Sequence, residues 1–250
     1  MNVVIFSGPY PVGEQMGGVG LRLWELAQTV AGAGVGVALV TPTGCDLTCP
    51  GVEAMVFAEE RWPDLIDAAD AVVTTDLPDS RLLLYAHAAG RLLVTENAVP
   101  IEHLGYDGVR RACDPDEAYA DLRDRYLLQT WLSDHFLVRS PVERATTIAV
   151  LAAAGRLGYL HYITGPTLPD LISLLPVGFT DDAAARADRA RVTVEETELV
   201  WSGGIWEYFD AGVLLHALVL LRDGGTTVRV RFCYPPPPGQ RLGEASRLLR

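Results

Sequence analysis

Short apolar runs alternate with longer segments of helical periodicity along most of this 250-residue chain. The runs at 3–6, 36–41 and 71–75 contain no charged or amide side chain. Unbroken apolar runs of this length are typical of strands buried on both faces, because helices cover a parallel sheet above and below. The alternation therefore predicts an α/β fold, in which a Rossmann-like parallel sheet carries helices on both faces.

The same pattern predicts the bounds of the other elements up to residue 178. Further strands are predicted at 54–58, 91–95 and 135–138, and helices at 19–30, 63–69, 81–89, 116–131 and 141–154. Ser140 directly precedes the last of these helices and is predicted as its N-cap, because a serine oxygen can accept a hydrogen bond from a first-turn amide. Parallel sheets bind ligands at the carboxyl ends of their strands, so the loops after the strands are the expected location of a site.

The pattern changes at 180–191, which is charged, rich in alanine and without a strand pattern. We interpret 179–195 as a linker or hinge between a first domain at 1–178 and a second that begins at 196. After the linker, a strand is predicted at 198–201, a helix at 211–221, a strand at 227–232 and the start of another helix at 243–250. This is less than a doubly wound domain needs, so we predict an incomplete second Rossmann-like domain with a tendency to self-associate.

Charge and residue usage exclude several classes of function. The chain has 20 basic and 32 acidic residues and a net charge of −12, so we predict no nucleic-acid partner. All of the basic residues are arginine, which excludes a Schiff-base lysine and a phosphate-loop lysine. The four cysteines have no CxxC spacing. We interpret them as reduced thiols of a cytoplasmic protein, with a Cys45–Cys49 bridge as the alternative.

Membrane and metal sites are also disfavoured by the sequence. The uncharged stretch at 26–45 is interrupted by glycines and a proline, so we predict no transmembrane segment and leave peripheral membrane contact open. The five histidines are scattered and form no HxxxH or HExxH pair. We therefore predict no metal site.

The strongest local feature is the glycine-rich loop at 7–20, SGPYPVGEQMGGVG, between the first strand and the first helix. Gly17, Gly18 and Gly20 allow a ligand to approach the backbone, and the N-terminus of the following helix offers free N–H groups to an anion. The dinucleotide fingerprint GxGxxG fails, because Leu23 stands where the third glycine should be. We predict a phosphate-binding loop, with a plain glycine-rich turn as the alternative.

Polar side chains follow two further strands of the first domain. Asp76 comes directly after one strand, and Glu96 and Asn97 come after the next. Carboxylates at such positions can orient sugar hydroxyls or transfer protons, so these three residues are the candidate catalytic groups. The alternative is that they cap helices or solvate loops.

The first strand of the second domain also ends in a glycine-rich segment. Gly203 and Gly204 follow that strand and would again allow a phosphate to approach the backbone. Trp206 can stack on a base or a sugar ring, or it can simply pack in a core. We predict all three as donor-side residues.

Three segments in this order resemble a known family. Residues 7–11 followed by GGVGLRLWELAQTVAGAGVGVALVTP (17–42) are similar to the N-terminal half of the family-4 retaining glycosyltransferases, which have two Rossmann-like domains in the GT-B arrangement. DHFLVRSPVERATTIAVLAAAGRL (134–157) and LVWSGGIWEYFDAGVLLHAL (199–218) resemble later landmarks of a bacterial branch of that family.

The resemblance implies an activity and a separate binding role for each of the two domains. A first domain at 1–178 would bind the acceptor and supply a glycine loop over the donor phosphates, and the domain beginning at 196 would bind a nucleotide-sugar. The reaction would transfer a hexose-like sugar from a nucleoside-diphosphate donor to a hydroxyl acceptor with retention. The nucleotide-sugar is then a co-substrate and no further cofactor is expected. Gly17 and Gly18 match the donor-facing glycines, and Gly203 matches the glycine after the first strand of the nucleotide domain.

The chain also departs from that family. Gly204 and Asp210 stand where the family has an arginine and a lysine for the pyrophosphate, and no basic residue occurs from 192 to 221. Glu96 and Asn97 replace a histidine that often follows the fifth strand. The E-x7-E donor motif would lie beyond Arg250, so we interpret the chain as a fragment or a truncated product. The alternatives are a non-catalytic nucleotide-sugar or carbohydrate-binding module and, disfavoured by the failed fingerprint, an NAD-dependent oxidoreductase or epimerase.

Overall fold

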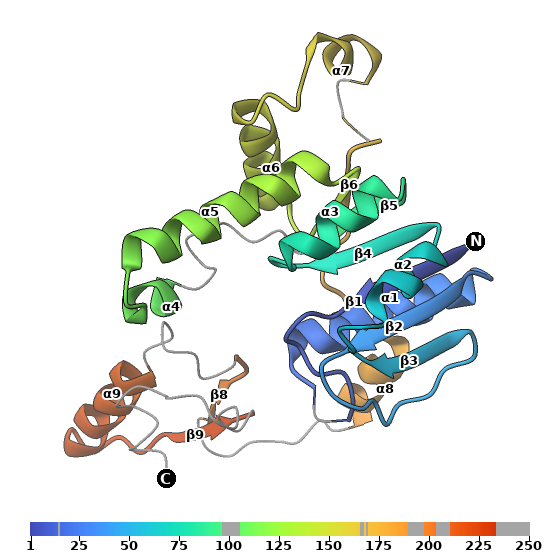
Figure 1. Ribbon diagram of the computed structural model, residues 1–250. Coiled ribbons are helices and arrows are strands. Elements are labelled where there is room, and N and C mark those ends of the chain that lie inside the picture. Colours follow the sequence, from blue (N-terminus) through green and yellow to red (C-terminus); the bar gives the residue numbers. More distant parts are fainter. Residues whose placement is uncertain are drawn as a thin grey trace. The chain divides into compact units, whose positions relative to one another are not determined.

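The computed structural model describes residues 1–14, 16–96, 106–165, 168, 170–189, 198–203 and 211–233. The chain divides into two compact units, Met1–Gly178 and Phe179–Arg250. Figure 1 shows the helices and strands of both units.

The first unit is built on one parallel sheet of seven strands. The strands are β1 (Asn2–Phe6), β2 (Gly36–Thr41), β3 (Val52–Val56), β4 (Ala71–Thr75), β5 (Leu92–Glu96), β6 (His135–Val138) and β7 (Ile172–Leu174). Their order is β3-β2-β1-β4-β5-β6-β7, so the direction of winding reverses between β1 and β4. Ligands of open α/β sheets bind at such a switch point, beyond the carboxyl ends of the strands.

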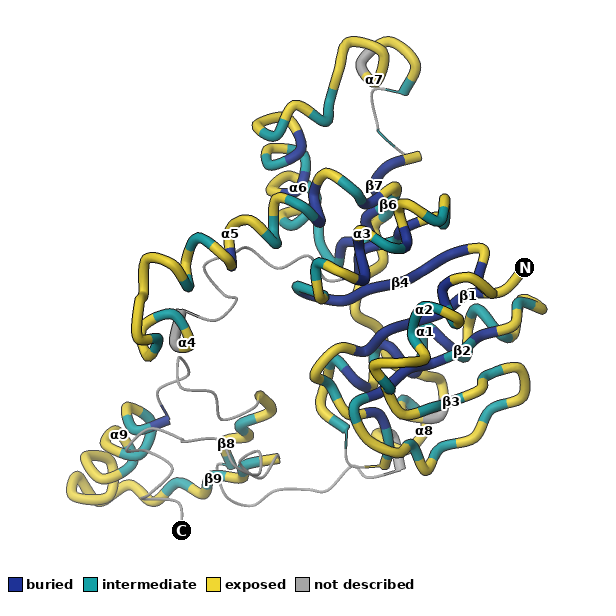
Figure 2. Tube along the Cα trace, viewed as in Figure 1, coloured by how far each residue is buried: buried dark blue, intermediate teal, exposed yellow. Residues whose placement is uncertain are grey.

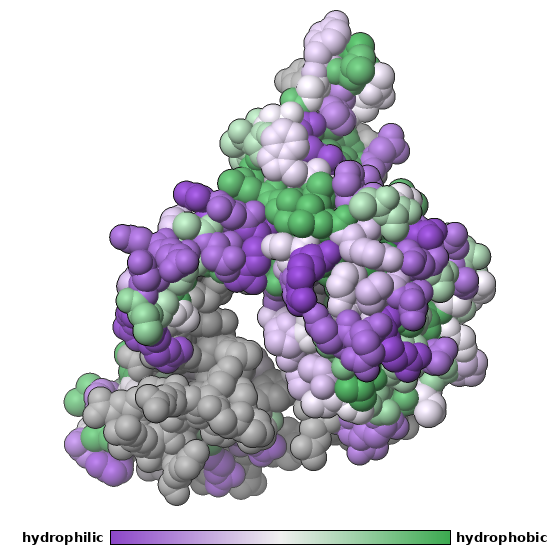
Figure 3. Space-filling model, in the orientation of Figure 1, coloured by the Kyte–Doolittle hydropathy of each residue, from purple (hydrophilic) through white to green (hydrophobic). Residues whose placement is uncertain are grey.

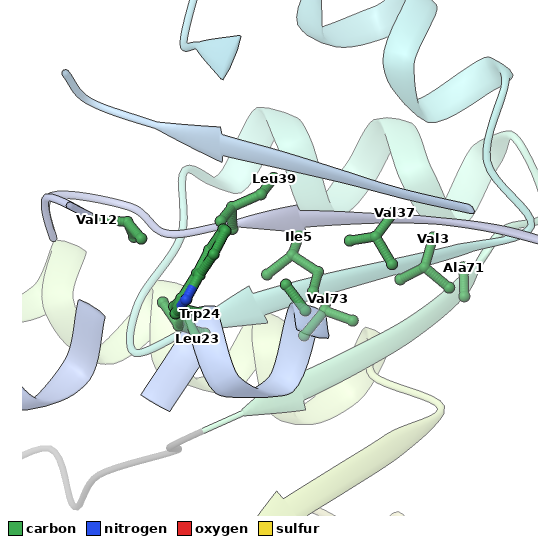
Figure 4. Close-up of a cluster of buried hydrophobic side chains, with 10 residues drawn as sticks. Val3, Ile5, Val12, Leu23, Trp24, Val37, Leu39, Ala71 and Val73 are labelled. Carbon is green, nitrogen blue, oxygen red and sulfur yellow. The ribbon is translucent and has the colours of Figure 1, made fainter. Parts of the chain in front are cut away.

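Helices cover both faces of this sheet, which confirms the predicted fold class. The helices of the first unit are α1 (Gly18–Gly32), α2 (Trp62–Asp67), α3 (Ser80–Ala88), α4 (Tyr106–Arg111), α5 (Pro115–Leu132), α6 (Pro141–Ala153) and α7 (Tyr159–Thr164). Leu23 and Trp24 of α1 pack on one face of the sheet, against Ile5 and its neighbours (Figure 4). On the other face, α2 and α3 cover Val4 and Phe6. Adjacent β1 residues thus serve opposite cores, and Figure 2 shows the central strands buried.

The surface of the first unit is mixed in polarity. Leu84 of α3 and Leu127 and Trp131 of α5 are exposed. In Figure 3 a hydrophobic area lies where α3, α5 and α6 are drawn in Figure 1, among hydrophilic side chains. Single exposed apolar side chains are ordinary on soluble folds and assign no function by themselves.

The third strand lies two residues earlier than predicted. We expected 54–58, but β3 pairs in parallel with β2 from Val37 opposite Val52 to Thr41 opposite Val56. The strand begins directly after a tight turn at Gly51 (φ +83°). Its start is therefore set by this turn and by the pairing with β2. The connection from β2 to β3 contains no helix, and instead Cys45, Leu47 and Cys49 of that loop pack on the α1 face. Both of these cysteines are free thiols.

Three short elements were not predicted, namely α4, α7 and β7. Each has six residues or fewer, which is too short for a helical or strand period to stand out. His161 lies in α7 and accepts a hydrogen bond from the Gly158 amide at 3.1 Å. The Ser140 N-cap is confirmed, since its oxygen accepts a hydrogen bond from the Glu143 amide at 3.1 Å.

The second unit contains the predicted strand–helix–strand pattern. Its described elements are α8 (Asp181–Arg189), β8 (Glu198–Trp201), α9 (Ala211–Asp223) and β9 (Arg229–Phe232). β8 and β9 pair in parallel from Glu198 opposite Arg229 to Trp201 opposite Phe232. α8 occupies most of the segment that we interpreted as a hinge helix, and the helix predicted at 243–250 lies outside the described residues. None of the helices in the described ranges has both the length and the apolarity that a membrane crossing requires.

Hydrogen exchange is expected to be much faster in β8 and β9 than in β1. Ile5 of β1 is fully buried, whereas Val200 of β8 is 58% exposed and Leu220 of α9 is 73% exposed. A parallel sheet is stable when both faces are covered, so the two-stranded sheet should open locally with a smaller free energy. We expect its amides to exchange at least ~100-fold faster, measured by mass spectrometry on a verified monomer. Equal protection of β1 and β8 would contradict this.

Candidate functional site

The candidate site lies at the carboxyl edge of the first unit's sheet. Four strands end there with polar residues directly after or at their last position, and these are Ser7, Asp76, Glu96 and Arg139 after β1, β4, β5 and β6. Because parallel strands end at the same edge of a sheet, these four residues lie at one edge although they are far apart in the sequence. α1 and α6 begin at this edge as well.

The glycine loop leads directly into the first turn of α1. Gly17 is the N-cap residue in extended conformation (φ −78°, ψ 178°), and the Leu21 amide donates to its carbonyl at 3.0 Å. A β-carbon added at Gly17 or Gly18 would meet no atom of the described residues within 4 Å. Gly17 has no side chain that could accept a hydrogen bond from the first-turn amides. The arrangement can therefore present backbone N–H groups to an anion.

Gly20 has a different role from the two glycines before it. It is buried, and a β-carbon there would lie 2.2 Å from the Pro11 carbonyl oxygen and 3.0 Å from the Met16 β-carbon. The first contact is with backbone, which cannot rotate away as a side chain can. Glycine at this position lets the loop lie directly on α1, and it supports the loop from beneath.

Glu96 at the end of β5 is a fully buried carboxylate. The Arg22 Nε donates a hydrogen bond to its Oε1, and the Thr75 hydroxyl donates to its Oε2 at 3.2 Å. Burial raises the pKa of Glu96 above its ordinary value, although the hydrogen bonds and the charge of Arg22 act in the opposite direction. Glu96 is thus held by partners on both oxygens, which suits a group that orients its neighbours.

Arg22 links three parts of the first unit. Besides its bond to Glu96, its Nη2 donates to the Leu175 carbonyl at 2.8 Å and its Nη1 to the Pro176 carbonyl at 3.3 Å. Arg22 stands four residues after Gly18, so it lies on the same face of α1, one turn further along. It therefore holds the start of α1 against β5 and against the segment that follows β7.

Asp76 follows β4 in a strained backbone conformation. Its φ of +51° lies in the left-handed region, and the residue is buried. The Tyr10 hydroxyl donates a hydrogen bond to Oδ2 of Asp76, and Tyr10 is itself held by Ser7, whose hydroxyl donates to the Tyr10 carbonyl at 2.8 Å. Non-glycine residues in this conformation cluster at functional sites. The contact joins the ends of β1 and β4, where the winding of the sheet reverses.

Arg139 and Glu143 form an ion pair at the start of α6. The Arg139 Nε donates to Glu143 Oε1 at 2.8 Å, its Nη2 donates to the same oxygen, and its backbone amide donates to Oε2 at 2.7 Å. Burial alone would raise the pKa of Glu143, but the bonds from Arg139 outweigh it and the pKa is lowered. Burial likewise works to lower the pKa of Arg139, but Glu143, and more weakly the charges of Glu96 and Asp76, raise it.

The structure brings together part of the predicted set. Asp76 and Glu96 lie at the carboxyl edge to which the α1 N-terminus with Gly17 and Gly18 also belongs. Gly203 belongs to the second unit, where it follows β8 in an exposed position. Asn97, Gly204 and Trp206 lie outside the described residues.

Sequence reasoning missed Arg22, Tyr10 and Arg139. Arg139 directly follows a predicted strand, as Asp76 does, so the rule that identified Asp76 could also have identified it. Arg22 had a weaker signal, which is its helical spacing of four from Gly18. Nothing in the sequence connects Tyr10 with Asp76, because only the sheet order places the two loops side by side.

Two further observations on the described residues concern a cavity and the absence of a metal site. A cavity of about 470 Å³ opens near the amino-terminal ends of β1, β2 and β3, at the opposite edge of the sheet, where its lining includes Asn2, Gly36 and Leu65. Its lining does not include Asp76, Glu96 or Arg139, and we give it no role in the chemistry. Within the described ranges, no group of three or more His, Cys, Asp or Glu side chains is arranged to hold a metal ion.

No family model and no curated protein matches this sequence. Solved structures do match. Sucrose-phosphate synthase from Thermosynechococcus elongatus is similar over 99% of this chain, with a TM-score of 0.55 and 14% sequence identity. The chain has the fold of the GT-B glycosyltransferases.

Two other solved structures support this assignment of the fold. A UGT transferase from Siraitia grosvenorii in complex with UDP is similar over 96% of this chain, with a TM-score of 0.53 and 9% identity. WaaG, a glycosyltransferase involved in lipopolysaccharide biosynthesis, is similar over 92%, with a TM-score of 0.53 and 15% identity. The chain spans 66%, 64% and 63% of the lengths of these three GT-B chains. At such low identity the likeness concerns the fold alone.

Proposed function

We propose that this protein, or the longer protein to which it belongs, is a retaining glycosyltransferase. It would transfer a sugar from a nucleoside-diphosphate donor to a hydroxyl acceptor. The observation that carries the proposal is the open start of α1 at Gly17 and Gly18, at the carboxyl edge that also holds Asp76 and Glu96. The GT-B fold and the resemblance of 17–42 to family-4 enzymes support it.

The chemistry of such a transfer needs a stabilised leaving group. The bond between the anomeric carbon and the donor phosphate oxygen breaks, the acceptor oxygen bonds to the anomeric carbon, and the acceptor proton passes to the departing diphosphate. First-turn amides of α1 would donate hydrogen bonds to that diphosphate as its charge grows. Retention requires attack from the face that the leaving group departs from, which is consistent with a site where amides and carboxylates share one edge.

The described carboxylates differ in the role that we assign to them. Glu96 is fully buried and held by Arg22 and Thr75, so it would position α1 and β4 and would not act as a nucleophile. Asp76 lies at the switch point and would accept a hydrogen bond from the acceptor hydroxyl. Asn97 remains a candidate from its sequence position. Gly203, Gly204 and Trp206 would serve the nucleotide in the second unit, and Gly20 would support the loop. The nucleotide-sugar would be a co-substrate, with no metal or other cofactor.

A second function is favoured by one observation. No arginine or lysine occurs from 192 to 221, so the second unit has no cation of its own for a diphosphate in that segment. A non-catalytic nucleotide-sugar or carbohydrate-binding module would tolerate this. The two functions differ in turnover, which a binding module lacks.

Gly18→Val is expected to lower the transfer rate without unfolding the first unit. A β-carbon at Gly18 meets no described atom within 4 Å, and a valine side chain there would occupy the open space before α1 and keep a phosphate from the amides. We expect kcat/KM for nucleoside-diphosphate release to fall about 100-fold at unchanged melting temperature. The assay would use the full chain with UDP-, GDP- and ADP-sugars and NAD as the non-donor control.

The matched control is Gly32→Val at the other end of the same helix. Gly32 is exposed, and a β-carbon there also meets no described atom within 4 Å. It should leave both turnover and nucleotide binding unchanged. Equal turnover in Gly18→Val and the wild type would remove the loop from the donor site. Tight nucleotide binding without any turnover would favour the binding module.

A further inference from the structure

The donor diphosphate of the proposed reaction needs a cationic partner, and the second unit does not offer one in the expected place. Diphosphates carry localised negative charge that is bound best by charge-assisted hydrogen bonds, usually from arginine or lysine. The segment 192–221, whose sequence includes β8, contains neither residue. The arginines at the carboxyl edge of the first unit are therefore the cations to compare.

Two arginines stand near Glu96 at the carboxyl edge of the first unit, and they differ in what their nitrogens contact. Arg22 uses Nε, Nη1 and Nη2 for Glu96, Pro176 and Leu175, and its side chain is 13% exposed. Its guanidinium is thus committed to the tie between α1, β5 and the segment after β7. Arg22 has no free edge for a ligand.

Arg139 retains a free edge. Glu143 holds its Nε and Nη2, no described residue accepts a hydrogen bond from its Nη1, and its side chain is 29% exposed. A guanidinium presents one pair of parallel N–H donors on each of two edges, so a carboxylate on the Nε–Nη2 edge leaves the Nη1–Nη2 edge for a phosphate. Glu143 also accepts from the Arg139 amide and donates from its own amide to Ser140, so the anchoring carboxylate is itself fixed.

We propose that Arg139 binds the diphosphate of the donor. The inference rests on the proposed function and adds to it a residue of the first unit as a phosphate contact. Glu143 is a positioning residue that orients the guanidinium. Asp76 follows β4 and Arg139 follows β6 at the same carboxyl edge of the sheet, so an acceptor hydroxyl on Asp76 would lie at the edge where the diphosphate is bound.

Arg139→Met is expected to weaken binding of inorganic pyrophosphate and of UDP by about 10- to 100-fold, the effect of losing a charge-assisted hydrogen bond. Isothermal titration calorimetry on the full chain would measure both, with uridine as a probe that lacks phosphate and should be unaffected. Arg139→Lys keeps the charge but loses the fork geometry, so it should weaken pyrophosphate binding less than the methionine does. It also keeps the test valid if Arg139→Met does not fold.

Arg81→Met is the matched control. Arg81 also lies after a strand of the same edge and is also paired with carboxylates, but Asp79 and Glu59 occupy its Nε, Nη1 and Nη2. It should leave pyrophosphate binding unchanged. Equal weakening by Arg81→Met and Arg139→Met would overturn the proposal as a general charge effect.

The remaining outcomes separate this proposal from the proposed function. UDP binding that Arg139→Met leaves intact would overturn the role of Arg139 and keep the glycosyltransferase proposal. Absence of binding of UDP, GDP, ADP and pyrophosphate to the wild-type chain would overturn both.

Discussion

Replacing Arg22 with methionine is expected to lower the free energy of unfolding of the first unit by about 3–5 kcal/mol. The substitution leaves the Glu96 carboxylate buried without its ion-pair partner, with only the Thr75 hydroxyl still donating to it. It also removes the bonds to the carbonyls of Leu175 and Pro176. Urea unfolding followed by circular dichroism would measure the loss.

A double-mutant cycle tests whether the buried charge is the reason. Glu96→Gln in the Arg22→Met background removes that charge and should restore more than half of the lost stability. Arg81→Met is the control for removing an arginine, and since its ion pairs are exposed it should change stability little. A double mutant as unstable as Arg22→Met would show that packing, and not charge, dominates.

The loss caused by Arg22→Met should also depend on pH. The pKa of Glu96 is higher in the folded protein than in the unfolded chain. Stability is therefore lost as the pH rises from the unfolded pKa of this group through its folded pKa. Arg22 lowers the folded pKa of Glu96, so this pKa rises further when Arg22 is removed. The pH range over which stability is lost then extends to higher pH. The difference between variant and wild type should therefore be larger at pH 8 than near pH 5. A difference that does not change with pH would contradict a charged Glu96.

Gly20→Ala is expected to destabilise the first unit by about 2–3 kcal/mol, while Gly18→Ala two residues earlier changes stability by less than about 0.5 kcal/mol. The methyl group at Gly20 would lie 2.2 Å from the Pro11 carbonyl oxygen, so the loop must shift away from α1. At Gly18 the same methyl group meets no described atom within 4 Å. Thermal and urea unfolding of the two variants would measure the contrast.

The pair Gly18 and Gly20 also separates packing from ligand binding. Gly20→Ala should lower nucleotide binding only by the fraction of molecules in which the loop is unfolded or displaced. Gly18→Ala adds one methyl group in the open space and should affect binding at full stability. If both variants were equally stable, the contact of Gly20 with the Pro11 backbone would not be the reason for glycine at that position.

Much of the first unit was predictable from local pattern. The strands at 36–41, 71–75 and 135–138 agree with the structure residue for residue, because buried parallel strands are unbroken apolar runs. The Ser140 cap was readable because capping involves neighbours in the chain. β3 was misplaced by two residues, since its bounds depend on pairing with β2 and not on its own pattern.

Local sequence pattern was enough to predict the fold class and two residues at the carboxyl edge of the sheet. Apolar runs specify buried strands, and Asp76 and Glu96 follow such runs, so their place at the carboxyl edge needed no coordinates. The contacts between Arg22 and Glu96 and between Tyr10 and Asp76 span 74 and 66 residues, and they form only when the sheet is assembled. The physical reason is that strand order decides which loops meet, and the same apolar runs are compatible with several orders. Tertiary packing likewise decided that Gly20 supports the loop while Gly17 and Gly18 face open space.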